Sequence, residues 1–282
     1  MKDNKICLIT GATSGIGKAA ALELARQGMQ IIFNARDEEK AGNIMDEIIH
    51  STGNKDIRWY WCDLASFKSI KEFAEQVRKN HKRLDILINN AGTWRITKET
   101  TIDGIESTFE VNHLAPFLLT NLLLPIISDS GSGRIINVSS GVHYMGRIDI
   151  NDPEFKDKAF RGSKAYAQSK LANILFTKEL AARLQQKRIT VNCLAPGWVN
   201  TGLLRYSSPV AKLSARLWAR TPTRGAETTV YLATSDEVRD ITGEYFYDKR
   251  IRRSASQSYD SELMKKLWEL SEKYVKDYLP DI

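Results

Sequence analysis

The sequence contains few residues that form disulfide bonds or bind metals: three cysteines and four histidines in 282 residues. Each cysteine, Cys7, Cys62 and Cys193, lies in an apolar run, and their odd number argues against a disulfide framework. Free thiols are typical of a reducing compartment, so we expect a cytoplasmic protein. The histidines show no metal-ligand spacing, and we predict no metal site.

Long hydrophobic runs are also missing. The first apolar segment begins at Ile6, so we expect neither a signal peptide nor an N-terminal anchor. The longest uncharged stretch, Val111–Ser128, contains two prolines, two asparagines and a histidine, which makes it a poor membrane span. We predict a helix buried against the rest of the domain, and no integral membrane segment.

Charge is not balanced: the formal net charge is +7. The resulting positive field suits an anionic cofactor, a nucleic acid or an anionic membrane, and charge alone does not choose among them. The basic segment Arg250–Arg253 is interpreted as a solvated face, because no recognition motif accompanies it. We predict no nucleic-acid binding.

Short apolar runs alternate with amphipathic segments of helical length. The predicted strands are Ile6–Thr10, Gln30–Asn34, Ile57–Cys62, Leu84–Asn89, Arg134–Val138, Arg188–Leu194 and, more weakly, Glu244–Tyr247. The predicted helices include Gly17–Gln27, Glu38–His50, Ser66–Lys79, Ser163–Gln186 and Gly225–Thr234. This alternation predicts an α/β fold, a doubly wound parallel sheet with helices on both faces. Ligands bind such sheets at the carboxyl ends of the strands.

Three segments interrupt the alternation, and none of them marks a domain boundary. Residues 141–162 and 205–223 follow predicted strands and are interpreted as loops that cover a substrate. The tail 250–282 has apolar residues at helical spacing behind a predicted cap at Asp260. We expect this helix to pack on the core or on a loop of the same chain, and 1–282 to form one domain.

A glycine-rich turn follows the first strand and precedes an alanine-rich helix. Its sequence is Thr10-Gly11-Ala12-Thr13-Ser14-Gly15-Ile16-Gly17. Gly11 permits a tight turn, Gly15 lets the backbone approach a pyrophosphate, and Gly17 lets helix and strand pack closely. The helix N-terminus supplies donors and positive potential to the phosphates. The glycine spacing alone is a weak signal, but in this position it predicts dinucleotide binding.

The end of the second strand decides which dinucleotide binds. An NAD site needs a carboxylate here, and Ala35 offers none, whereas Arg36 can pair with a 2′-phosphate. We expect NADP, with NADPH preferred over NADH. The alternative is that Arg36 is solvated and Asp37 or another group serves NAD.

Tyr166 and Lys170 lie one helical turn apart and share a face. A tyrosine titrates near pH 10, and a neighbouring ammonium favours its phenolate, so the pair suits proton transfer. Ser140, at the end of the fifth strand, could hydrogen-bond the substrate oxygen and orient it. A second Tyr-x-x-x-Lys copy, Tyr245 to Lys249, lies in a predicted strand, where the two side chains are too far apart to couple.

Several motifs together resemble the short-chain dehydrogenase/reductase superfamily. They are Thr10–Gly17, Asn89-Asn90-Ala91-Gly92, Asn137-Val138-Ser139-Ser140, Tyr166–Lys170 and Pro196-Gly197, in that order over roughly residues 5 to 250. The resemblance implies a single Rossmann-type domain with seven parallel strands. It also implies hydride transfer between a carbonyl and an alcohol.

The resemblance further implies the role of each site residue. Asn112 would join a proton relay, Ser140 would orient the substrate, and Tyr166 would be the acid/base. Lys170 would bind the nicotinamide ribose and lower the tyrosine pKa, and Asn89 would steady the central sheet. The implied cofactor-binding set is Gly11, Thr13, Ser14, Gly15, Ile16, Gly17, Arg36, Asp63, Leu64, Asn90, Ala91, Gly92, Tyr166, Lys170, Pro196, Gly197, Val199 and Thr201. The alternatives are a polar helix position for Asn112, a strand-end cap for Ser140 and a turn for Thr201.

Within the superfamily, Val111–Thr120, Ser169–Thr177 and the long interval from Ser140 to Tyr166 resemble the retinol dehydrogenase-like branch. That branch acts on retinoids and other hydrophobic carbonyls. Apolar residues in the two predicted substrate loops agree with a lipophilic aldehyde, ketone or alcohol as the partner. Two alternatives stay open: a protochlorophyllide reductase-like enzyme and a non-catalytic dinucleotide sensor. The helix around Phe117–Ile127 is either a homodimer seam or a buried core helix.

Overall fold

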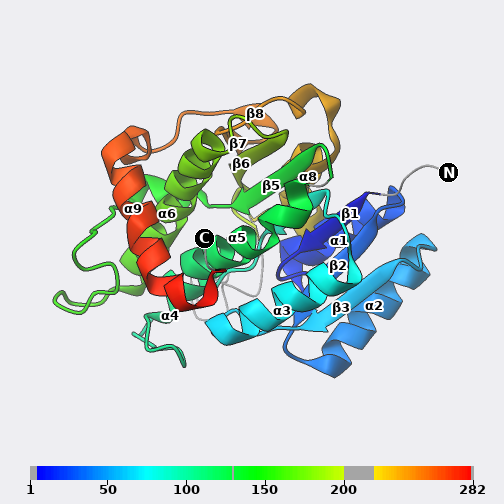
Figure 1. The fold of residues 1–282 in the computed structure, drawn as a ribbon, viewed down its shortest axis with the longest axis horizontal. Helices are drawn as coiled ribbons and strands as arrows, with labels where there is room; N and C mark the ends of the chain where they lie inside the picture. The colour runs from blue at the N-terminus through cyan, green and yellow to red at the C-terminus, as the bar shows by residue number, and fades with distance from the viewer. Residues whose placement is uncertain (1–4, 129, 200–218, 281–282) are drawn as a thin grey trace.

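The computed structural model describes residues 5–128, 130–199 and 219–280, and its centre is a sheet (Figure 1). The strands are β1 (Ile6–Ile9), β2 (Gln30–Ala35), β3 (Ile57–Trp61), β4 (Ile86–Asn89), β5 (Gly133–Val138), β6 (Ile189–Ala195), β7 (Tyr245–Tyr247) and β8 (Arg250–Ile251). They are ordered β3-β2-β1-β4-β5-β6-β7-β8. The strand order reverses between β1 and β4, which is where such sheets bind ligands.

Helices cover both faces of the sheet. They are α1 (Gly15–Arg26), α2 (Glu38–Thr52), α3 (Phe67–Asn80), α4 (Ser107–Phe109), α5 (Ala115–Ser128), α6 (Gly162–Arg183), α8 (Pro222–Thr234) and α9 (Ser261–Val275). One apolar core joins α1, α2 and α8 to the sheet, and another joins α3, α5, α6 and α9 to its opposite face. Alternate residues of one strand enter the two cores, as Leu8 and Ile9 of β1 do. The doubly wound prediction is therefore confirmed.

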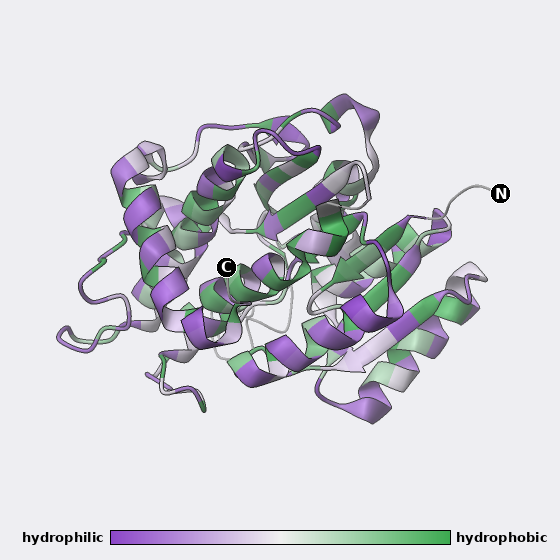
Figure 2. Cartoon of the chain, viewed as in Figure 1, coloured by the Kyte–Doolittle hydropathy of each residue, from purple (hydrophilic) through white to green (hydrophobic). Residues whose placement is uncertain are grey.

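Local sequence signals explain where these helices begin. Asp37, Ser66 and Asp260 precede α2, α3 and α9, and each side chain accepts a hydrogen bond from a backbone N–H of the first turn. The predicted cap at Asp260 is thus confirmed. Figure 2 shows hydrophobic residues along the central strands and hydrophilic residues on the outer turns of α3 and α9. Burial of one helix face against the sheet stabilises these elements.

The expectation of seven strands is incomplete. β1 to β7 are parallel, as expected, but β8 pairs antiparallel with β7, in the register Tyr247↔Arg250. Asp248 and Lys249, between them, both have positive φ angles, 49° and 60°. Two central residues with φ > 0 form the tight turn that suits a hairpin. The turn lacks glycine and asparagine, which is why the sequence did not predict it.

The apolar stretch predicted as a buried helix forms a π-helical turn, Glu110–Leu114, followed by α5. By length and composition the helical segment Ser107–Ile127 could cross a membrane, and 78% of that window is buried inside the protein. Phe117, Leu119 and Leu123 are fully covered. This burial agrees with a core helix and covers much of the surface on which a dimer seam was considered.

The C-terminal helix α9 packs on α6. The Trp268 ring lies 4.8 Å from Phe117 and 5.9 Å from Phe176, and Arg183 covers it at 4.1 Å. Leu267 and Val275 are also buried. The expectation that the tail packs on the core is confirmed.

A series of buried polar side chains crosses the middle of the sheet. Asn89 of β4 donates to Thr120 of α5 at 3.0 Å and to Asn137 of β5 at 2.8 Å. Asn137 donates in turn to Thr177 of α6 at 2.9 Å. The series joins two neighbouring strands to the two helices above them, just where the strands end.

Candidate active site

The glycine-rich turn has the shape that close approach of a dinucleotide requires. Gly11 and Gly15 have φ angles of 70° and 57°, which favour glycine. A Cβ atom on Gly17 would lie 2.3 Å from the Gly11 carbonyl oxygen, so only glycine fits there. Thr13 and Ser14 lie between Gly11 and Gly15, and Ile16 lies in the first turn of α1, which begins at Gly15. The turn and the first N–H groups of α1 therefore form a cradle that fits a pyrophosphate.

The Asn-Ala-Gly segment is tied to the glycine-rich turn. The Thr10 hydroxyl accepts hydrogen bonds from the backbone N–H groups of Asn90 and Ala91, both at 3.0 Å. The Asn90 side chain donates back to the Thr10 carbonyl at 2.8 Å. A Cβ on Gly92 would approach the Lys170 ammonium to 3.2 Å. These contacts fix the carboxyl ends of β1 and β4 beside each other and keep the space next to Lys170 open.

Arg36 and Asp63, predicted for the adenosine end of the cofactor, lie together after β2 and β3. Arg36 is largely exposed, and its guanidinium lies 3.3 Å from the Asp63 carboxylate. Asp63 also accepts from the Ala65 N–H at 3.1 Å, and Leu64 is buried beside it. The guanidinium is therefore accessible to a 2′-phosphate, which would compete with Asp63 for it.

Ser140, Tyr166 and Lys170 meet at the same edge of the sheet. Ser140 follows β5, and the other two lie one turn apart near the start of α6. The Lys170 ammonium lies 5.7 Å from the centre of the Tyr166 ring and donates to the Val138 carbonyl at 3.1 Å. The Ser140 side chain lies close enough to the Tyr166 hydroxyl to lower its pKa. The structure therefore brings three of the four predicted catalytic side chains together.

Burial changes the acidity of both titratable groups. It raises the pKa of Tyr166 to about 12, and the hydrogen bond with Ser140 opposes that change. It lowers the pKa of Lys170 to about 8. In the protein alone, desolvation of the phenolate outweighs the lowering effect of Ser140. The lowering of this pKa that we expect from Lys170 together with the positive nicotinamide ring of a bound cofactor stays a prediction. Tyr166 is thus a neutral phenol at neutral pH, the form that can donate a proton.

Asn112 lies in the π-helical turn and supports the site through its side chain. Its amide donates to Ser169 and to the Thr93 carbonyl, both at 2.9 Å, and accepts from the Thr93 N–H at 2.7 Å. Ser169 donates to the Tyr166 carbonyl at 2.8 Å. π-Helical turns are frequent at functional sites because they re-aim one residue. Asn112 therefore connects the loop after Gly92 to the helix that holds Tyr166.

The last predicted cofactor segment follows β6. Gly197 has a φ of 84°, and a Cβ there would lie 3.0 Å from the Arg220 guanidinium. Val199 is buried and pairs with Arg220. Pro196 opens the turn. Thr201 and most of the predicted loop 205–223 lie outside the described residues.

Two residues near the site were missed by the sequence analysis. The Trp94 ring lies 5.9 Å from the Tyr166 ring, tilted by 32°, and its indole N–H is buried without a partner among the described residues. A Cβ on Gly162 would lie 1.9 Å from the Arg95 carbonyl, so this glycine lets the loop that contains Trp94 approach α6. The signal was available, since Trp94 follows Gly92 by two residues. The other residue is His143, whose ring accepts a hydrogen bond from the Ala255 N–H in the C-terminal segment.

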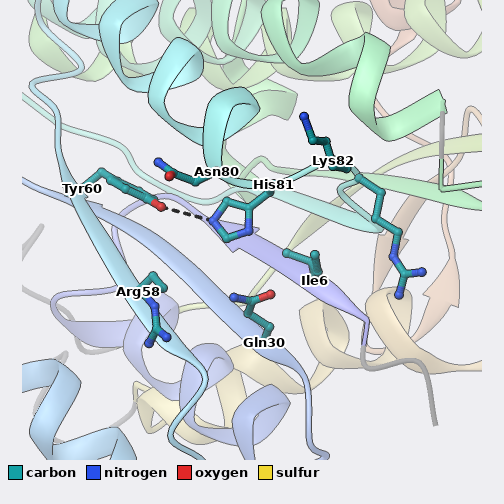
Figure 3. Close-up of a pocket in the computed structure, with 8 residues that line it drawn as sticks. Ile6, Gln30, Arg58, Tyr60, Asn80, His81 and Lys82 are labelled. Carbon is teal, nitrogen blue, oxygen red and sulfur yellow. Dashed lines mark hydrogen bonds between the residues drawn. The ribbon is translucent and has the colours of Figure 1, made fainter. Parts of the chain in front are cut away.

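A cavity of about 530 Å³ opens at the opposite, amino-end edge of the sheet. Figure 3 shows Arg58 and Lys82 on opposite sides of it and pointing away from each other, with the Tyr60–His81 hydrogen bond of 3.2 Å between them. The two cations do not converge on one point. This cavity contains none of the predicted site residues, and it is separated from them by the length of the strands.

Comparison with known proteins agrees with this geometry. The family model described as short chain dehydrogenase matches residues 5–211. Human retinol dehydrogenase 13 is 42% identical over 286 residues, which cover 99% of this chain and 86% of the relative.

Two solved structures are also similar. A crystal structure of an uncharacterised protein from Mycobacterium paratuberculosis matches with a TM-score of 0.79 and 31% identity, over 98% of this chain and 95% of the other. A short chain dehydrogenase from Shigella flexneri, complexed with NADP, matches with a TM-score of 0.68 and 29% identity, over 86% of this chain and 95% of the other. The chain therefore belongs to the short-chain dehydrogenase family and is an oxidoreductase related to the retinol dehydrogenases.

Proposed function

We propose that this protein is an NADP(H)-dependent oxidoreductase that interconverts a lipophilic aldehyde or ketone and its alcohol. One observation carries the proposal: Ser140, Tyr166 and Lys170 meet at the carboxyl edge of the sheet, beside the glycine-rich turn. A non-catalytic dinucleotide sensor would need the turn alone. The combination of the turn with a proton donor and an orienting hydroxyl supports an enzyme.

The site residues divide the chemistry among them. The bound dinucleotide would supply hydride to the carbonyl carbon, or accept it from the alcohol. Ser140 orients the substrate oxygen by hydrogen bonding. Tyr166, a neutral phenol in this site, donates its proton to that oxygen during reduction and takes it back during oxidation. Lys170 places a positive charge near the tyrosinate that reduction leaves behind.

Exposed apolar side chains near the site support a lipophilic substrate. Tyr144 and Met145 follow Ser140, and Trp198 follows Pro196 and Gly197; at least half of each of these three side chains is exposed. The Trp94 ring adds a further apolar surface beside Tyr166. Apolar and aromatic linings are typical of sites for hydrophobic small molecules. The name of the human relative, a retinol dehydrogenase, points to the same class of substrate.

Absorbance of NADPH, followed in the presence of retinal, long-chain aldehydes, ketones and sugars, tests the proposal. We expect NADPH to be consumed with the lipophilic carbonyls and much more slowly with the sugars. Equal or faster turnover of sugars would contradict the substrate class. Tight NADPH binding without consumption across a widened panel would favour the sensor.

Arg36→Ala tests the choice of cofactor. We expect NADPH to bind about tenfold or more weakly, with little change for NADH, because a charge-assisted hydrogen bond to the extra phosphate is lost. Titration of the intrinsic fluorescence with each dinucleotide measures both affinities. Arg26→Ala is the matched control, since Arg26 is an exposed arginine on α1 that pairs with Glu23 on the same helix. An equal loss of affinity for NADPH and NADH would show that Arg36 does not bind the 2′-phosphate.

A further inference from the structure

His143 lies three residues after Ser140, in the short 3-10 helix Gly141–Met145, and is fully buried. A buried histidine that the proposed chemistry does not use needs a physical explanation. The Tyr144 and Tyr245 rings contact it at 4.0 Å and 4.8 Å. Both ring nitrogens have backbone partners, so His143 cannot itself exchange protons with a substrate.

The two backbone partners fix the protonation of the ring. The Ala255 N–H, a donor, lies 3.2 Å from Nε2, so Nε2 must accept and lacks a hydrogen. Nδ1 then bears the hydrogen and donates it to the Ser140 carbonyl at 2.7 Å. Burial lowers the pKa of His143, which agrees with a neutral ring. The ring therefore bridges Ala255 and Ser140: it accepts a hydrogen bond from the Ala255 N–H and donates one to the Ser140 carbonyl.

The Ser140 carbonyl receives two hydrogen bonds from this one residue. Besides Nδ1, the His143 backbone N–H donates to it at 3.1 Å. These two bonds fix the orientation of the peptide group that follows Ser140, at the point where β5 ends and the 3-10 helix begins. Because the Ser140 side chain lies beside the Tyr166 hydroxyl and lowers its pKa, its placement bears directly on the proposed chemistry.

The far end of the bridge belongs to the C-terminal segment Arg253–Tyr259. The Tyr144 hydroxyl donates to the Arg253 carbonyl at 2.6 Å, which holds this segment against the 3-10 helix. The Ser258 N–H donates to the Ala255 carbonyl at 2.9 Å, so a tight turn orients Ala255. α9 follows and packs on α6, the helix of Tyr166. The C-terminal segment therefore contacts the 3-10 helix that follows Ser140, and α9, which follows the segment, contacts α6, which holds Tyr166.

We propose that His143 is a positioning residue for Ser140: it holds the serine through Nδ1 and is braced by the C-terminal segment through Nε2. The proposal rests on the function proposed above, in which Ser140 orients the substrate. Loss of the Nδ1 bond should lower kcat while leaving dinucleotide affinity unchanged.

Two substitutions separate the two bonds of the ring. His143→Asn keeps an amide N–H near the position of Nδ1 and loses the acceptor for Ala255. His143→Gln keeps an acceptor near the position of Nε2 and loses the donor to Ser140. We expect kcat within about threefold of wild type for the asparagine variant and a loss of about 10- to 100-fold for the glutamine variant, because small misplacements at a reacting group are costly.

Three readouts make the result decisive: kcat and KM with the best carbonyl substrate, the NADPH Kd, and amide hydrogen exchange over residues 139–145. Exchange should be faster in the glutamine variant than in the asparagine variant, with Kd unchanged in both. His81→Gln is the control, because His81 is a buried histidine with a side-chain hydrogen bond at the opposite edge of the sheet. It should leave kcat unchanged.

Equal kcat and equal exchange in the two His143 variants would overturn the proposal, as would losses of kcat that follow the losses of thermal stability and of NADPH affinity. If the wild-type protein reduces no carbonyl but exchange separates the variants as expected, the proposed function fails and the bridge to Ser140 stands.

Discussion

Tyr166→Phe is expected to lower kcat for carbonyl reduction by about 10²- to 10⁴-fold, the range that loss of a positioned proton donor produces. Phenylalanine keeps the ring that packs at 5.9 Å from Trp94 and removes only the hydroxyl. The affinity for NADPH should therefore change little. Steady-state kinetics together with a fluorescence titration of NADPH measures both quantities on the same preparation.

A matched variant guards against a general effect of losing a tyrosine hydroxyl. Tyr231→Phe removes a hydroxyl that donates to Glu237 at 2.9 Å on the outer side of α8, and it should retain wild-type kcat. A Tyr166→Phe enzyme with wild-type turnover would exclude Tyr166 as the proton donor. The second Tyr-x-x-x-Lys copy offers no substitute, because Lys249 pairs with Glu227 and Tyr245 is buried in β7.

Gly17→Ala is expected to weaken NADPH binding at least tenfold and to destabilise the protein by about 1–3 kcal/mol. The new Cβ would lie 2.3 Å from the Gly11 carbonyl oxygen and 2.4 Å from the Asn90 side-chain nitrogen. Helix α1 must then move away from the turn that would hold the phosphates. Urea unfolding and NADPH titration measure the two effects.

Gly42→Ala is the control for this substitution. Gly42 lies within α2, and nothing lies within 4 Å of a Cβ placed there. Alanine at such a helical position should stabilise by about 0.5–1 kcal/mol. NADPH binding as tight in Gly17→Ala as in the wild type would mean that the turn is not the phosphate cradle.

Most of the fold could be predicted from the sequence because its elements are strongly patterned. β1 to β7 begin and end within two residues of their predicted bounds. β8 was missed because a turn of Asp248 and Lys249 resembles no common hairpin signal. The π-helical turn at Asn112 was missed because apolar periodicity does not distinguish it from an α-helix.

The candidate site was predictable where spacing or motif order brings residues together, as for Tyr166 and Lys170. The raised pKa of Tyr166 in the protein alone was not predictable, because desolvation depends on how the folded chain surrounds the hydroxyl. His143 was also missed, since its contact with Ala255 joins residues 112 positions apart. Contacts of that kind follow from the course of the C-terminal segment, which no local signal in the sequence encodes.

The buried polar side chains between β4 and β5 restrict which sheet this chain can form. Asn89 pairs with Asn137 in the strand register, and the two also share a side-chain hydrogen bond. A register shift of β4 by two residues would leave each side chain on the same face of the sheet. It would also break the hydrogen bond between the two buried amides, at a cost of about 1–3 kcal/mol for each unpaired group. Asn90 and Ser140 follow these strands by one and two residues. A shift in the register of β4 and β5 would therefore move Asn90, which is tied to the glycine-rich turn, along the strand direction relative to Ser140. Correct pairing of the two strands is thus also a condition for activity.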